Sequence, residues 1–157
     1  MRPIKAHRRQ RALPFVPSVY RLLFPNGNAG SPSRIELREL ELFETIGGPD
    51  PTTGGVATSS TVLSTNTPDR LIDNSGTSVF QCWGQNGDWW RVNLVTPAWV
   101  NRMVIAGSGT QPYWNPEVTL LQYLAQDNAT WVTRITTPAY GTNDWPINTT
   151  KTFDYAG

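Results

Sequence analysis

Short runs of strand-forming residues recur along almost the whole chain, and each run ends at a turn residue such as Gly, Pro, Asn or Asp. This regular alternation of strands and turns restricts the fold more than any other feature of the sequence. No helical crossover separates successive runs, which favours antiparallel pairing between them. We therefore predict one all-β domain over residues 18–157, an antiparallel jelly-roll β-sandwich of about eight strands. The predicted strands span residues 19–24, 79–83, 89–94, 100–106, 118–124, 131–136 and 151–155.

Two segments leave their structure open. Residues 34–44 (RIELRELELFE) are rich in helix-favouring Leu, Glu and Arg, but Ile35 and Leu37 alternate, and Leu40 and Leu42 alternate again after a one-residue slip. That spacing fits a bulged strand or a turn followed by a strand, with a helix as the alternative. Residues 47–66, rich in Gly, Thr, Ser and Pro, fit either a loop or a weakly paired edge strand.

The first 17 residues differ from the rest of the chain in charge. Six of the 13 basic residues occur by Arg21 and no acid occurs before Glu36, whereas residues 22–157 carry seven basic and twelve acidic residues, a balance of −5. We interpret residues 1–17 as an extended basic arm that contacts an acidic partner surface, with a solvated tail as the alternative. The arm residues expected to make contacts are Arg2, Lys5, Arg8, Arg9, Arg11, Leu13, Phe15 and Val16.

Composition argues against catalysis. The only histidine, His7, lies in the arm, so the predicted domain has no histidine for a nucleophile–base pair or a zinc site. Cys82 is the only cysteine, which excludes an internal disulfide, and its place beside Phe80 and Trp83 predicts a buried thiol. No two carboxylates are marked as a pair by their spacing. We expect a protein that is not an enzyme.

Targeting signals are not evident either. The chain begins without the apolar run of a signal peptide, and no stretch approaches the roughly 20 apolar residues of a membrane-spanning helix. The expectation is synthesis in the cytoplasm and no insertion into a membrane.

Four segments together resemble the galactose-binding-like jelly roll of discoidin domains and related carbohydrate-binding modules. No one of them is specific, but their order and spacing match over roughly residues 19–155. Three positions depart from the family pattern: Asn74 and Val95 stand where the family has Gly, and Asn93 where it has Asp. The segments are 35–43, 71–74 with Thr77 and Trp83, 89–94 running into 100–105, and 116–120 with 122–123 and 127–131.

The resemblance extends to a particular setting. Residues 20–24, the glycine pairs at 47–48 and 54–55 and the following Ser/Thr stretch look most like members encoded by bacteriophages and prophages, where the domain belongs to virion proteins. This implies a non-enzymatic structural or accessory protein of a virion, attached through its arm and in contact with other virion proteins in an oligomeric assembly. Nucleic acid is not an expected partner.

The resemblance also implies an alternative, a carbohydrate-binding module that recognises a host-surface or cell-wall glycan through loops at one end of the sandwich. Aromatic residues of such loops can stack on sugar rings, or can instead cap the sandwich or face a neighbouring subunit. Trp90, Trp99 and Trp131, on the predicted strands, are expected in the core. The loop residues predicted to contact a glycan or partner are Trp83, Tyr113, Trp114, Asn115, Asn143, Asp144 and Trp145.

Calcium is the one cofactor that the resemblance leaves open. Members with a calcium site use an Asp side chain and loop carbonyls, and Asp73 and Thr77 are the corresponding oxygen donors here. The turn lacks its usual Gly, however, and the sequence places no acidic cluster beside Asp73, whereas calcium takes six to eight oxygen ligands. The main expectation is therefore no cofactor.

Overall fold

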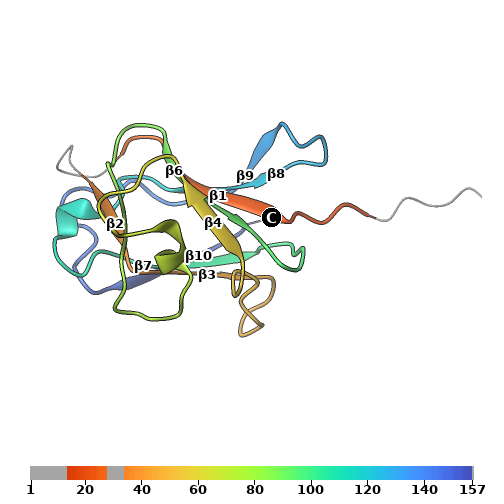
Figure 1. Cartoon of the computed structure of the whole chain (residues 1–157), viewed down its shortest axis with the longest axis horizontal. Coiled ribbons are helices and arrows are strands. Elements are labelled where there is room, and N and C mark those ends of the chain that lie inside the picture. The colour runs from red at the N-terminus through yellow and green to blue at the C-terminus, as the bar shows by residue number, and fades with distance from the viewer. Residues whose placement is uncertain (1–13, 28–33, 157) are drawn as a thin grey trace, which may run out of the picture.

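The computed structural model describes residues 14–27 and 34–156 (Figure 1). This part of the chain is all-β, as predicted, with two short 3₁₀ helices, η1 (Pro68–Leu71) and η2 (Pro112–Trp114). The strands are β1 (Val19–Phe24), β2 (Ile35–Leu37), β3 (Glu39–Phe43), β4 (Val56–Ser59), β5 (Phe80–Cys82), β6 (Asp88–Asn93), β7 (Arg102–Ala106), β8 (Leu120–Leu124), β9 (Trp131–Thr136) and β10 (Thr150–Asp154).

All strand pairs are antiparallel, and they form three sheets. The largest has the order β4-β6-β1-β8-β9, the second the order β10-β7-β3, and β2 pairs with β5 alone. Figure 1 shows the five-stranded sheet as one layer and the three-stranded sheet as the layer below it. This arrangement is compatible with a β-sandwich.

One core fills the space between the layers. Alternate residues of β1, among them Tyr20 and Leu22, are fully buried, and they join a cluster with Leu40 of β3 and Met103 of β7. Trp90 is fully buried in the same cluster, as predicted. Strands such as β1, β3 and β6 therefore alternate between a buried face toward the core and a more exposed face, whereas all residues of β2 and β5 are buried.

The ambiguous segment 34–44 is two strands, not a helix. β2 ends at Leu37 and β3 begins at Glu39, so the one-residue slip in the apolar pattern falls at Arg38. The slip marks the point where the pairing changes, since β2 pairs with β5 and β3 pairs with β7. The backbone N–H of Arg38 continues the second pairing by donating to the carbonyl oxygen of Ala106 at 2.9 Å.

Within residues 47–66, the structure places β4 at the edge of the five-stranded sheet, so this segment contains both predicted alternatives, a loop and an edge strand. The prediction that Trp99 and Trp131 belong to the core is wrong. Both side chains are only partly buried, because Trp99 lies in the loop before β7 and Trp131 points to the outer face of β9.

The molecule has two ends that differ in content (Figure 1). One end, here called the arm end, carries residues 14–18, Tyr155 and the loops 44–55 and 94–98. The opposite end, called the loop end, carries β2, η2 and the loop 138–149. Arm residues 1–13, which include Arg2, Lys5, Arg8, Arg9, Arg11 and Leu13, lie outside the described residues.

Candidate functional site

Two of the seven loop residues predicted to contact a ligand are buried. Asn115 and Trp145 each expose only 1% of their surface. The Asn115 side chain joins two loops, since its Oδ1 accepts from the backbone N–H of Ser108 at 2.7 Å and its Nδ2 donates to the carbonyl oxygen of Trp145 at 2.9 Å. The contact role predicted for Asn115 and Trp145 is therefore corrected: they hold the loop end together from inside.

The Trp145 indole occupies an interior position that only a glycine neighbour permits. Its ring lies 5.4 Å from the ring of Tyr140 and 6.4 Å from that of Phe153, and its Nε1 donates to the carbonyl oxygen of Thr149 at 3.3 Å. A Cβ on Gly107 would lie 2.7 Å from the same nitrogen. Residue 107 must therefore lack a side chain for the indole to pack here.

A buried carboxylate supports the same loops. Glu36 of β2 exposes 1% of its surface and accepts four hydrogen bonds. Three donors to Oε1 come from the loop after β7, and the fourth, to Oε2, comes from β5. A buried carboxylate surrounded by donors is a structural anchor for the segment that carries them. The donors are Ser108 Oγ, Gly109 N, Thr110 Oγ1 and Gln81 Nε2.

The other predicted loop residues stay at or near the surface. Trp83 is 49% exposed. Trp114 is partly buried, with the Tyr113 ring edge-on at 5.9 Å and the Arg34 guanidinium 4.3 Å from the centre of its ring. The surface members of the predicted set are Trp83, Tyr113, Trp114, Asn143 and Asp144.

The two predicted calcium donors, Asp73 and Thr77, lie in an exposed turn and take part in its internal hydrogen bonds. The carboxylate of Asp73 accepts from Ser75 N at 2.9 Å and from Ser78 Oγ at 2.6 Å, and Thr77 Oγ1 lies 2.9 Å from Ser75 Oγ. In residues 14–27 and 34–156, no three His, Cys, Asp or Glu side chains gather closely enough to hold a metal ion.

The fold brings acids toward Asp73 that the local sequence does not place there. Gly76 N, in the same turn, donates to Glu39 Oε2 at 3.4 Å. Burial raises the pKa of Glu39 from its usual 4.5 to about 7, and the nearby carboxylates of Asp73 and Glu41 add to the shift. Its Oε1 is buried and has no hydrogen-bond partner among the described residues. Glu39 therefore holds a proton at acid pH and loses it near neutrality.

At the arm end, the last arm residues pack on their own domain. The Phe15 ring lies 6.2 Å from the ring of Trp99 and 6.4 Å from that of Tyr123. The carbonyl oxygen of Pro17 accepts from Ala98 N at 3.0 Å. Val16, the other described arm residue in the predicted contact set, is partly buried. Within the described residues, packing against the domain therefore includes Phe15, three residues before the predicted boundary.

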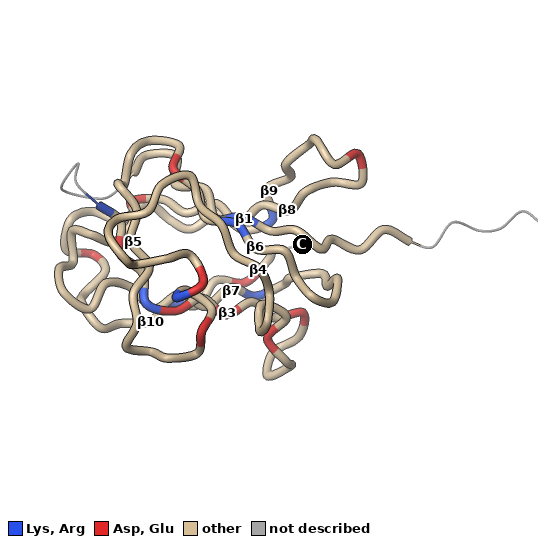
Figure 2. Tube along the Cα trace, viewed as in Figure 1, with Lys and Arg blue, Asp and Glu red and all other residues tan. Residues whose placement is uncertain are grey.

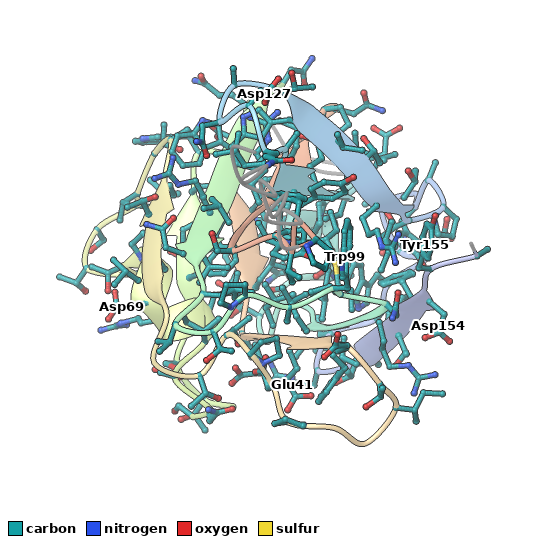
Figure 3. The ribbon with its side chains drawn as sticks, turned by 90° about the vertical axis from the view of Figure 1, so that its right-hand side faces the viewer. Glu41, Asp69, Trp99, Asp127, Asp154 and Tyr155 are labelled. Carbon is teal, nitrogen blue, oxygen red and sulfur yellow. The ribbon has the colours of Figure 1, made fainter. Side chains whose placement is uncertain are left out.

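Exposed apolar side chains surround the arm end. Of the seven large apolar residues that are most exposed in the described chain, four lie here: Ile46 (76%), Val95 (71%), Val56 (66%) and Tyr155 (41%). Two hollows, of about 390 and 420 Å³, open beside them and share Glu44 in their walls. Figure 3 looks onto this end, with Trp99 near its centre and Tyr155 to one side.

The thiol of Cys82 is buried, as predicted. Burial raises its pKa to about 12, so the thiolate that a nucleophile requires is disfavoured.

The prediction missed four residues on the outer face of the five-stranded sheet. Arg21 of β1, Trp89 and Arg91 of β6 and Trp131 of β9 line one hollow of about 190 Å³, which we call the Arg–Trp face. The guanidinium of Arg21 lies 4.1 Å from the centre of the Trp131 ring. Alternation along β6 around the buried Trp90 could have predicted that Trp89 faces outward. That Arg21 of β1 lies beside Trp131 of β9 could not be predicted without knowing the order of strands in the sheet.

Scans of the chain against protein-family models, characterised proteins and solved structures found no match. The resemblance to galactose-binding-like domains therefore stays a prediction from the order of residues in the sequence. Among the described residues, no helix has both the length and the apolar content needed to cross a membrane.

Proposed function

We propose that this chain is a non-enzymatic structural or accessory protein of a bacteriophage virion, with a galactose-binding-like jelly-roll domain attached through its N-terminal arm. The observation that carries the attachment is the concentration of exposed apolar side chains at the arm end, around the point where the chain enters β1. Exposed apolar patches mark protein–protein contact surfaces. The phage setting comes from the resemblance in residue order.

Charge supports the same arrangement. The arm carries five basic residues before Leu13 and no acid, whereas residues 22–157 have a balance of −5. Figure 2 shows acidic positions distributed over loops at both ends of the domain. A basic arm is attracted to acidic surfaces, including that of a second copy of this domain, and such attraction accelerates encounter and orients it. The apolar patch at the arm end would then supply buried area.

The test is incorporation into particles assembled without the natural chain. The test variant replaces Arg2, Lys5, Arg8, Arg9 and Arg11 by Gln. The matched control replaces Arg70 and Arg102, which lie in the domain, by Gln. We expect mass spectrometry of purified particles to detect the wild-type chain and the control, with the arm variant reduced at least tenfold. Equal incorporation of the arm variant, or absence of the wild-type chain from particles, would contradict the proposal.

The exposed indole of Trp83 favours a second candidate, a carbohydrate-binding module that uses the loop end. Trp83, Tyr113 and Trp114 offer aromatic surface there, and Asn143 and Asp144 offer polar groups. The loop end lies opposite the arm end, so a domain held by its arm would present these residues outward. Glycan-array binding that is lost in Trp83→Ala and Trp114→Ala would support this function, and no binding by the wild-type chain would contradict it.

A further inference from the structure

The Arg–Trp face combines two partly exposed indoles with two arginines that have no carboxylate partner among the described residues. Arg21 and Arg91 are direct cross-strand partners in the β1–β6 register, with their side chains on the same face of the sheet. Like charges in that position repel each other. Nothing in the five described strands relieves the repulsion, because none of their outward-facing residues is Asp or Glu. The two guanidinium groups therefore lie side by side with no carboxylate from these strands, a position that favours the binding of an anion.

The two guanidinium groups differ in how they are held. Arg21 Nε donates to Gln122 Oε1 at 2.7 Å, and the Trp131 ring supports its other side. Burial lowers the pKa of Arg21, with no contribution from a carboxylate. Arg91 Nε is buried and has no hydrogen-bond partner among the described residues. One arginine is thus fixed in place, and the other has a donor still to be satisfied.

The surroundings of the two cations identify the kind of molecule that fits. The hollow of about 190 Å³ accepts a single ring or charged group. A line of polar positions extends from it across the sheet, since Thr58 pairs with Arg91 on one side and Gln122 pairs with Thr133 on the other. At about 4.8 Å between strands, the line is about 19 Å long. A ligand that fits this line of residues is an extended chain that carries anionic groups, apolar ring faces and hydroxyls.

We propose that the Arg–Trp face binds an acidic polysaccharide through the carboxylate of a uronic acid residue. The carboxylate accepts from the guanidinium groups of Arg21 and Arg91, which suit its planar geometry. The apolar face of the sugar ring packs on the indole of Trp89, and the adjoining hydroxyls reach Thr58 and Thr133. This site is separate from the loop end and does not depend on the proposed virion role.

A nucleic acid fits the face less well. Binding a phosphate backbone requires several cations in a row, whereas this face has two and the surrounding domain has a balance of −5. A purely apolar partner would leave both guanidinium groups buried without an anion, which is unfavourable.

The experiment is calorimetric titration of the full-length chain with trigalacturonate and with its methyl ester, which has the same rings without charge. We expect the ester to bind at least tenfold more weakly. Arg91→Gln and Trp89→Ala should each lower affinity for trigalacturonate at least tenfold. Arg91→Lys keeps the positive charge but not the planar pair of N–H donors, so its affinity should lie between those of Arg91→Gln and the wild type. Arg102→Gln is the matched control, because Arg102 lies on the other sheet and already binds Asp154 at 2.6 Å, and its affinity should stay within twofold.

The alternatives give different results. Equal binding of the ester, or of the Arg91→Gln variant, overturns the proposal. A variant with the five basic arm residues replaced by Gln tests whether the arm, and not the Arg–Trp face, binds trigalacturonate. If only this variant loses binding, the proposal is overturned. Tighter binding of oligothymidylate that Arg91→Gln abolishes would assign the face to nucleic acid, and an oligomer that Arg91→Gln dissociates would assign it to a second copy of the chain. Thermal melts of each variant confirm that the compared proteins are folded.

Discussion

At the scale of single residues, the fold gives two carboxylates of neighbouring strands opposite environments. Glu36 of β2 is buried with four hydrogen-bond donors, whereas Glu39 of β3 has a buried oxygen with no partner in the part of the chain that the structure describes. The sequence alone does not distinguish these two residues, since both lie in the same Leu/Glu-rich segment. The donors to Glu36 Oε1 are more than 70 positions away in the chain.

The raised pKa of Glu39 predicts a pH dependence of stability. Between about pH 4.5 and about pH 7 the folded chain retains a proton on Glu39 that the unfolded chain has released. The free energy of unfolding therefore falls as pH rises through this window, and the penalty is constant above it. In Glu39→Gln this dependence should be absent, so the variant gains stability relative to the wild type as pH rises from 4.5 to 8.

Thermal melts of both proteins across this range measure the difference. Glu39 is only partly buried, so solvent screening keeps the effect below the full value of the shift. Glu41→Gln, on the same face of β3, is the control and should change the profile less. A constant difference between Glu39→Gln and wild type at all pH values would show that the carboxyl does not titrate in this window.

Asn115 is expected to be a stability residue, not a ligand contact. Asn115→Ala removes the hydrogen bonds from Ser108 N and to the Trp145 carbonyl at a buried position. We expect a loss of about 2–4 kcal/mol in the free energy of unfolding, seen as a melting temperature lower by roughly 5–15 °C. Asn143→Ala, at an exposed position in the same end, should change stability by about 0.5 kcal/mol or less. Similar melting temperatures for the two variants would contradict this role.

At the scale of elements, alternation in the sequence was sufficient to place most strands. The predicted strand 19–24 is β1 itself, and the slip inside 34–44 marks the change of partner from β5 to β7. Local patterns could not place the loop residues, because the burial of Trp145 depends on Gly107 and Asn115, which come from another loop. The Arg–Trp face likewise could not be predicted from local patterns, because its residues come together only through the strand order β6-β1-β8-β9 of the whole sheet.

The segment before β1 is expected to stabilise the domain. Phe15→Ala removes a partly buried ring from the contact with Trp99 and Tyr123, and should lower the free energy of unfolding by about 1–2 kcal/mol. Urea denaturation measures the loss, with Ser18→Ala, an exposed neighbour, as control. A chain that begins at residue 18 should lose at least as much as Phe15→Ala, whereas a chain that begins at residue 14 should match the full length. Equal stability of the 18–157 chain would show that the domain starts at Ser18.

At the scale of the whole molecule, the two ends expose different kinds of side chain. The arm end carries exposed apolar residues and the start of the described chain, and the loop end carries the surface aromatics around Trp83 and Trp114. The Arg–Trp face lies on the outer side of the five-stranded sheet, away from both the core and the three-stranded layer. A body held at one end would keep this face and the opposite end accessible.

The path from residues 14–18 into β1 has a mechanical consequence. β1 is the central strand of its sheet and is paired with β6 along six residues and with β8 along four. A force applied through the segment 14–18 acts along this strand, so it loads both ladders of hydrogen bonds in shear and cannot open them one at a time from an edge. Tension applied at the N-terminal side of the domain is therefore resisted by two ladders at once, whereas tension on an edge strand such as β10 is resisted by one.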